Sequence, residues 1–131
     1  MANKLIIENI VIDEFFKSLM FQEIMDIDLP RNERDTLLVV FRSTLHFDKW
    51  SDKIAMYWLS KKIGIGENTL RITLDRLESK SLVDISRSKG GKTKSVNRFN
   101  SFSLNSYLVD KVFRKWQEIK IDDGYDFIYD D

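Results

Sequence analysis

A change of hydrophobic spacing between residues 54 and 104 constrains the fold more than any other feature of the chain. Helical spacing runs over 54–64 and resumes over 67–80, with two glycines in the short break between. Strand-like alternation follows over 82–87 and again over 96–104. The expected packing residues of the two helices are Leu59, Ile63, Leu70, Leu74 and Leu77. A break this short forces the two helices to cross at a steep angle.

The order helix, tight turn, helix and hairpin is that of a winged helix-turn-helix, which binds DNA. Gly64 suits the left-handed position that ends the first helix. The predicted fold class is therefore mainly α with a small β-hairpin (α+β), a winged helix-turn-helix with flanking N- and C-terminal helices. At 131 residues and 43% hydrophobic, the chain is expected to form one domain with its own core.

The flanking segments divide that domain into four parts. We expect an N-terminal arm and helix over 1–30, a winged-helix core over 31–104, a C-terminal helix over 105–120 and an acidic tail over 121–131. The individual helices are expected over Ile10–Met25 with Asn9 as cap, over Asn32–Phe47, and over Tyr107–Lys120 with Asn105 or Ser106 as cap. Ser51 or Asp52 is expected to cap the helix that begins at Ile54, with Trp50 packing on the edge of the core.

Charge is distributed unevenly along the chain. The formal net charge is zero, but residues 42–98 carry thirteen basic and six acidic side chains. Residues 1–35 carry four basic and eight acidic side chains, and residues 105–131 carry four and seven. The basic excess therefore coincides with the helix-turn-helix pattern, as expected of a protein that contacts a phosphate backbone.

The second helix, 67–80, is the predicted recognition helix. Its polar side chains include types that bind base edges or phosphates in a major groove, since Asn pairs with adenine and Arg with guanine. The predicted DNA contacts on this helix are Asn68, Thr69, Arg71, Thr73 and Arg76. The alternative is that these residues form the solvated face of an ordinary surface helix.

The loop between the two strands, 87–98, is the predicted wing. It holds five basic residues, two adjacent glycines and no acid, which suits contact with a minor groove or its phosphates. The predicted contacts here are Arg87, Lys89, Lys92, Lys94 and Arg98. Its Gly-Gly-Lys-Thr run lacks the full spacing of a nucleotide-binding loop and joins two strands. A solvated hairpin tip is the alternative.

Other classes of function find no support in the sequence. The absence of cysteine excludes disulfides, thiolate zinc sites and cysteine nucleophiles. The lone His46 has no neighbouring ligand pattern, so we expect no enzyme activity, cofactor or metal. No segment is long and apolar enough for a membrane span, and a cytoplasmic location is expected. The Ile10–Met25 pattern is apolar nearly all round, which favours a homodimer through this helix and Tyr107–Lys120. The alternative is that the arm and the C-terminal helix cover that surface within one subunit.

The stretch from Arg31 to Leu104 resembles the N-terminal winged-helix domain of phage and plasmid replication proteins of the lambda O type. The resemblance rests on the helix 32–41, the run Asp52-Lys-Ile-Ala-Met-Tyr-Trp-Leu, Gly64, the leucines at 70, 74 and 77, and the Leu-Val step at 82–83. It implies binding to repeated origin sequences or to an operator. The tail after this stretch is short for a helicase-loading role.

The predicted function is sequence-specific binding of double-stranded DNA, as a replication-origin or operator-binding protein of a phage or plasmid. One alternative is a dimeric winged-helix transcriptional regulator. Another is a winged-helix module that binds a protein partner and no DNA.

Overall fold

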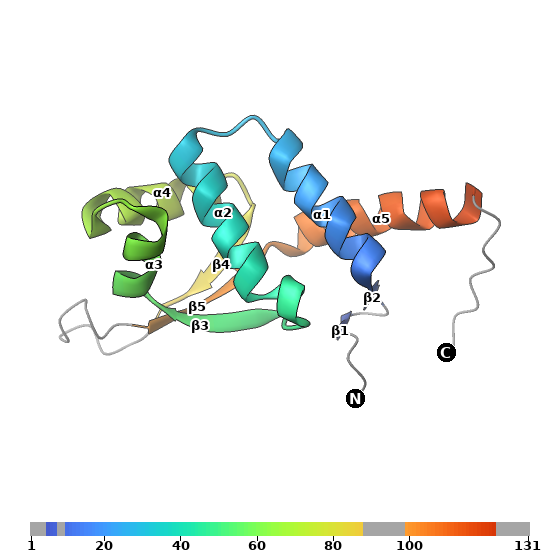
Figure 1. Cartoon of the computed structure of the whole chain (residues 1–131), viewed down its shortest axis with the longest axis horizontal. Coiled ribbons are helices and arrows are strands. Elements are labelled where there is room, and N and C mark those ends of the chain that lie inside the picture. Colours follow the sequence, from blue (N-terminus) through green and yellow to red (C-terminus); the bar gives the residue numbers. More distant parts are fainter. Residues whose placement is uncertain (1–4, 8–9, 88–98, 123–131) are drawn as a thin grey trace.

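The computed structural model describes residues 5–7, 10–87 and 99–122, which form a long, flattened molecule (Figure 1). Its elements in chain order are β1 (Leu5–Ile7), β2 (Ile10–Ile12), α1 (Glu14–Asp26), α2 (Arg31–Ser43), the 3-10 turn η1 (Leu45–Phe47), β3 (Ser51–Ala55), α3 (Met56–Ile63), α4 (Glu67–Ser79), β4 (Val83–Ser86), β5 (Phe99–Leu104) and α5 (Ser106–Asp122). The helices α2, α3 and α4 lie with the β3-β5-β4 sheet at one end, whereas α1 and α5 extend to the other (Figure 1).

The antiparallel sheet joins the two predicted wing strands to a third strand. β5 lies in the middle, paired on one side with β3 and on the other with β4. Asn100, Phe102 and Leu104 of β5 are buried under the helices, and the residues between them are more exposed. Helix, strand, helix, helix and two-stranded wing form a winged-helix-like α+β fold, so the predicted fold class is confirmed.

The strand β3 was not predicted from the sequence. Residues 51–55 were expected to be a polar connection and the start of a helix, but they pair with β5 through Asp52 opposite Phe102 and Ile54 opposite Asn100. The following helix α3 therefore begins at Met56, and neither Ser51 nor Asp52 caps it. Phe99, the first residue of β5, is 51% exposed, because it occupies the outward register of this strand.

The N-terminal helix also begins later than predicted. Ile10–Ile12 forms β2, which pairs with β1, and α1 starts only after Asp13. The Asp13 carboxylate accepts a hydrogen bond from the Phe16 amide at 2.8 Å, which caps the helix in the place expected for Asn9. Three consecutive β-branched residues suit a strand better than a first helical turn.

The helix predicted over 32–47 ends at Ser43. The Thr44 hydroxyl donates to the Val40 carbonyl at 2.7 Å, and the chain then turns through η1 to Asp48, whose φ is 61°. A left-handed residue stops any further helical hydrogen bonding. Trp50 is half-buried against the core, as predicted.

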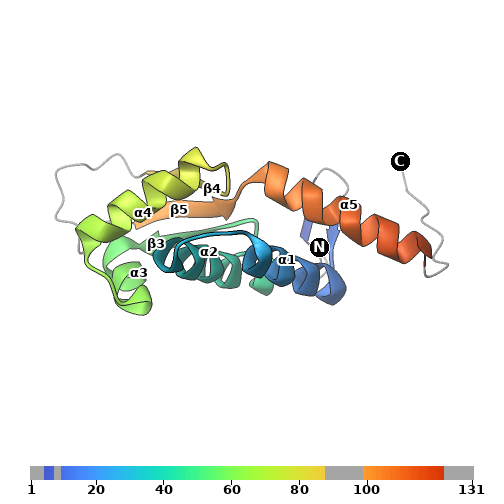
Figure 2. The same cartoon turned by 90° about the horizontal axis from the view of Figure 1, so that it is seen from above.

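The C-terminal helix α5 packs against α1 within the same chain (Figure 2). The buried Glu23 of α1 forms ion pairs with Lys111 at 2.8 Å and Lys115 at 2.6 Å on α5. The Trp116 indole donates to Asp13 at 3.1 Å. The predicted cap is also confirmed, because the Asn105 side chain accepts from the Tyr107 amide at 2.8 Å. Part of the apolar surface of α1 is thus covered without a second subunit.

No helix in the described part of the chain is long and apolar enough to cross a membrane.

Candidate nucleic-acid interface

The helix α4 is held on the core by one face and a tight turn. Leu70, Leu74 and Leu77 are fully buried beneath it. Gly64, at φ 85°, ends α3, and its amide donates to the Ser60 carbonyl at 2.8 Å. A left-handed backbone at this position favours glycine, which lets the chain reverse and start α4 at Glu67, three residues later. The predicted helix-turn-helix is therefore present.

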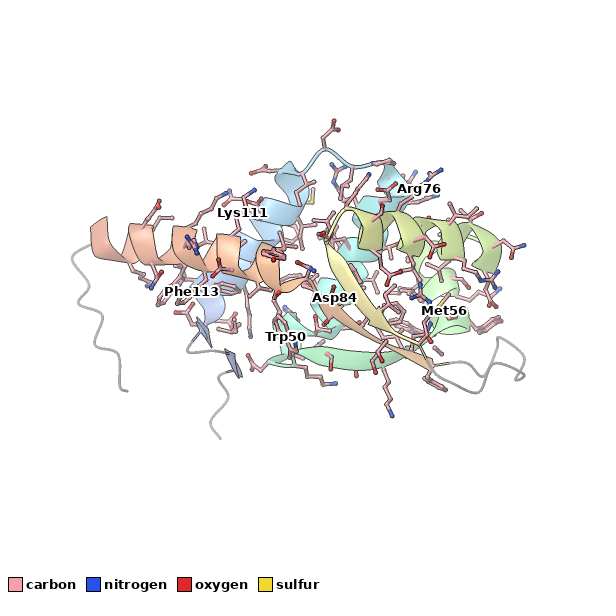
Figure 3. The ribbon with its side chains drawn as sticks, turned by 180° about the vertical axis from the view of Figure 1, so that it is seen from behind. Trp50, Met56, Arg76, Asp84, Lys111 and Phe113 are labelled. Carbon is pink, nitrogen blue, oxygen red and sulfur yellow. The ribbon has the colours of Figure 1, made fainter. Side chains whose placement is uncertain are left out.

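The opposite face of α4 is open to solvent and polar. Asn68, Thr69, Arg71 and Arg76 are exposed, as their predicted role requires, and Arg76 lies on the side of α4 away from the sheet (Figure 3). The Arg71 guanidinium donates to the Asn68 side-chain oxygen at 2.9 Å. This hydrogen bond holds the two side chains together on the first turns of α4, where a recognition helix meets bases.

Thr73 does not belong to this face. It is only 4% exposed, and its hydroxyl donates to the Thr69 carbonyl at 2.8 Å. A side chain one turn from both Leu70 and Leu77 falls on the buried face of a helix. The prediction that Thr73 contacts DNA is therefore corrected.

The charge on α4 does not by itself favour phosphate. The helix carries Glu67, Asp75 and Glu78 against only Arg71 and Arg76. Arg76 lies beside a groove of about 390 Å³ between α4 and the start of α2. That groove is lined by Pro30, Arg31, Asn32, Glu33, Thr69, Ile72, Thr73 and Arg76. Arg76 thus lies on the α2 side of α4, whereas Asp75 and Glu78 face Arg87, the residue after β4.

Arg87 forms ion pairs with both of these acids. Its guanidinium contacts Glu78 through two hydrogen bonds of 2.9 and 3.2 Å, and Asp75 at 3.4 Å. The hydrogen bonds that Arg87 donates to Glu78, together with the charges of both acids, raise the pKa of Arg87 above its ordinary value. Arg87 directly follows β4, so it fixes the start of the predicted wing to α4. Its predicted contact with DNA remains a prediction, since these bonds occupy much of the guanidinium.

The other predicted wing contacts, Lys89, Lys92, Lys94 and Arg98, lie outside the described residues.

Two groups of exposed side chains beside the predicted set were not assigned a role from the sequence. Ile72 is 53% exposed on α4, one turn from both Asn68 and Arg76. Tyr57 and Trp58 on α3 are 45% and 47% exposed. Met56, Leu59 and Ser60 form the buried face of α3, so Tyr57 and Trp58 face outward, a helical phase that the predicted packing residue Leu59 already implies.

Neither a protein-family model nor a curated protein matches the chain. Among solved structures, the chain is similar to a possible transcriptional regulator from Methanosarcina mazei Go1, with 10% sequence identity and a TM-score of 0.43. The similarity covers 84% of this chain and 83% of that one. A likeness at this level carries no argument about function, and the assignment of the winged-helix-like fold rests on the elements described above.

Proposed function

We propose that the chain is a non-enzymatic, cytoplasmic protein that binds double-stranded DNA at a specific sequence. The observation that carries the proposal is the exposed face of α4, where Asn68 and Arg71 are joined by a hydrogen bond on the first turns of the second helix of a helix-turn-helix. These are the side chains that recognise adenine and guanine edges in the major groove. The basic segment 87–98 follows β4 in the sequence.

In this proposal, the bases and the phosphates of the DNA are contacted by different parts of the protein. Asn68, Arg71 and Ile72 enter the major groove, and Ile72 contacts a thymine methyl group, the apolar group that a base edge presents there. Because α4 has more acidic than basic side chains, phosphate neutralisation falls mainly to the lysines of the wing. Arg31 and Arg76 add positive charge on the α2 side of α4.

The biological role that we propose is binding of a replication origin or operator of a phage or plasmid, which follows the resemblance to lambda O-type proteins. The second candidate is a dimeric transcriptional regulator. Selection of bound sequences from a random pool separates the two. Direct repeats in the enriched sequences would indicate an origin binder, and an inverted repeat would indicate a dimer with two-fold symmetry.

The experiment that tests DNA binding measures affinity for the selected duplex over a series of salt concentrations. Replacing Lys89, Lys92 and Lys94 together with alanine should weaken binding to all sequences similarly. It should lower the slope of log affinity against log salt by about 0.9 for each phosphate that the variant no longer neutralises. Arg71→Ala should instead cost about 1–3 kcal/mol on the selected duplex and reduce discrimination against a changed base pair.

Arg114→Ala is the control for a change of charge alone, because Arg114 is 75% exposed on α5, at the other end of the molecule from α4. Its effect on affinity and on the salt slope should be negligible. If the full chain binds no duplex, or if neither the triple variant nor Arg71→Ala changes the affinity, the proposed interface is wrong. A winged-helix module that binds only a protein partner would then replace it.

A further inference from the structure

A group of aromatic and lysine side chains lies on α3 and the neighbouring end of β5. On α3, Met56, Leu59 and Ser60 face the core, which leaves Tyr57, Trp58, Lys61 and Lys62 exposed on the remaining faces. Phe99, the first residue of β5, is 51% exposed and lies opposite Ala55, the residue that precedes α3. We call these five exposed residues, Tyr57, Trp58, Lys61, Lys62 and Phe99, the α3 aromatic surface.

The α3 aromatic surface exposes several large aromatic side chains to solvent. Single exposed apolar side chains are ordinary, whereas several large ones close together indicate an interaction surface. Tyr57 and Trp58 are consecutive on one short helix and about half-exposed, and Phe99 lies on the neighbouring strand end, in the outward register of β5. The duplex interface proposed above, on α4 and the wing, does not use them.

The charges on this surface identify the kind of partner. Helix α3 carries Lys61 and Lys62 and no acidic residue, and the Lys61 ammonium lies 5.2 Å from the centre of the Tyr57 ring. Aromatic faces beside ammonium groups complement a polyanion that also carries flat rings. A second copy of the chain fits poorly, since a two-fold contact brings the same patch of both subunits together, and this patch carries lysines and no acid.

We propose that the α3 aromatic surface binds an unpaired nucleic-acid strand. Bases of the strand stack on Trp58 and Tyr57, and its phosphates contact Lys61 and Lys62. An unpaired strand is favoured over a duplex because base pairs present only their edges in the grooves, whereas unpaired bases expose the ring faces that aromatic side chains stack on. This inference goes beyond the proposed duplex binding, and the two can fail separately.

The test measures fluorescence anisotropy of a labelled oligothymidine and, separately, of the labelled selected duplex, each titrated with the full chain. Trp58→Ala should weaken oligothymidine binding by about tenfold, as expected for the loss of one stacked base, and should change duplex affinity by less than about twofold. Trp58→Phe should retain most of the affinity, because a ring remains. Tyr107→Ala is the matched control, since Tyr107 is 79% exposed on α5, and it should leave both affinities unchanged.

Intrinsic tryptophan fluorescence gives a second measurement. Trp116 is only 8% exposed and Trp50 is half-buried, so quenching by oligothymidine should come mainly from Trp58. Quenching should therefore be largely lost in Trp58→Phe, although that variant still binds.

Four results would each overturn the inference. The first is a wild-type chain that does not bind oligothymidine at all. The second is a Trp58→Ala variant that has an unchanged circular dichroism spectrum and binds oligothymidine as well as the wild type does. Equal loss of oligothymidine and duplex affinity in Trp58→Ala would make the surface part of the duplex interface. Conversion of a wild-type dimer to a monomer by Trp58→Ala would identify a second copy as the occupant.

Discussion

Ile72 is the apolar residue in an otherwise polar stretch of α4. It is 53% exposed, and polar side chains one turn away surround it. An isoleucine in this place adds nothing to the core, because the buried face of α4 is formed by Leu70, Thr73, Leu74 and Leu77. Its chemistry matches the methyl group that distinguishes thymine from every other base edge in the major groove.

We therefore predict that replacing single thymines of the selected duplex by uracil weakens binding at one position. Uracil removes only the methyl group, so the expected loss is about 1 kcal/mol, the transfer free energy of one buried apolar carbon. In Ile72→Ala the same substitution should have little effect, because the partner of the methyl group is gone. The measurement is competition binding with each substituted duplex. Equal loss with the wild type and Ile72→Ala would contradict the contact.

Thr73 and Arg87 show what residue-level prediction could and could not achieve. The burial of Thr73 follows from its helical phase relative to Leu70 and Leu77, so the information was present in the sequence. The pairing of Arg87 with Asp75 and Glu78 was not predictable, because it depends on how β4 leaves the end of α4.

At the scale of elements, the helices and the turn were predictable because their signals are local. The leucine spacing of α4 indicates a helix, and Gly64 indicates where the preceding helix, α3, ends. Neither signal depends on the rest of the chain. The strand β3 was not, because its hydrogen-bonding partner is β5, far along the sequence. The division of the chain into arm, core, helix and tail remains a prediction.

The contact between α1 and α5 depends on one buried carboxylate. Burial raises the pKa of Glu23, but the ammonium groups of Lys111 and Lys115 outweigh it, so the pKa lies below its ordinary value. Figure 3 shows Lys111 on α5, beside α1. A lowered pKa in the folded state means that Glu23 stabilises the fold fully above the unfolded pKa, about 4.3, and that this contribution is lost as the pH falls through the folded pKa.

We predict that Glu23→Gln lowers the free energy of unfolding at pH 7 by about 1 kcal/mol, a modest value because both lysines are exposed to solvent screening. Below the folded pKa of Glu23, the wild type should lose most of that advantage. Urea unfolding at a series of pH values measures the difference, with the exposed Glu118→Gln as a control that should not change it. A difference between wild type and Glu23→Gln that stays constant down to about pH 3 would contradict the role of this ion pair.

At the scale of the whole molecule, the region of α3 and α4 and the region of α1 present different surfaces. The end with α3 and α4 carries the candidate nucleic-acid interface, whereas α1 exposes Phe21 and Met25 at 49% and 44%. A groove of about 770 Å³ lies beside them between α1 and α2, lined by Phe21, Leu38 and Phe41 among others. We propose the exposed face of α1 as the contact of a homodimer, because α5 covers only part of this helix.

Light scattering of the full chain should then give the mass of a dimer, and Phe21→Asp should give a monomer with an unchanged circular dichroism spectrum. Replacing Phe21 removes an apolar side chain from the contact, and burying a charged group in its place costs several kcal/mol of desolvation. Ile72→Asp is the control, since Ile72 is 53% exposed on α4, at the other end of the molecule from α1, and this variant should remain dimeric. A wild-type monomer at all concentrations would remove the dimer and favour independent binding to direct repeats.

The bridge from Arg87 to α4 also has a consequence for DNA shape. Arg87 is the first residue after β4, and its ion pairs connect it to Asp75 and Glu78 of α4. These ion pairs restrain the separation between α4 and the start of the basic segment 87–98. Two contacts at a fixed separation fit only DNA whose groove width matches it, and groove width varies with sequence. Base pairs that no side chain touches would then influence affinity through the width and stiffness that they give the duplex.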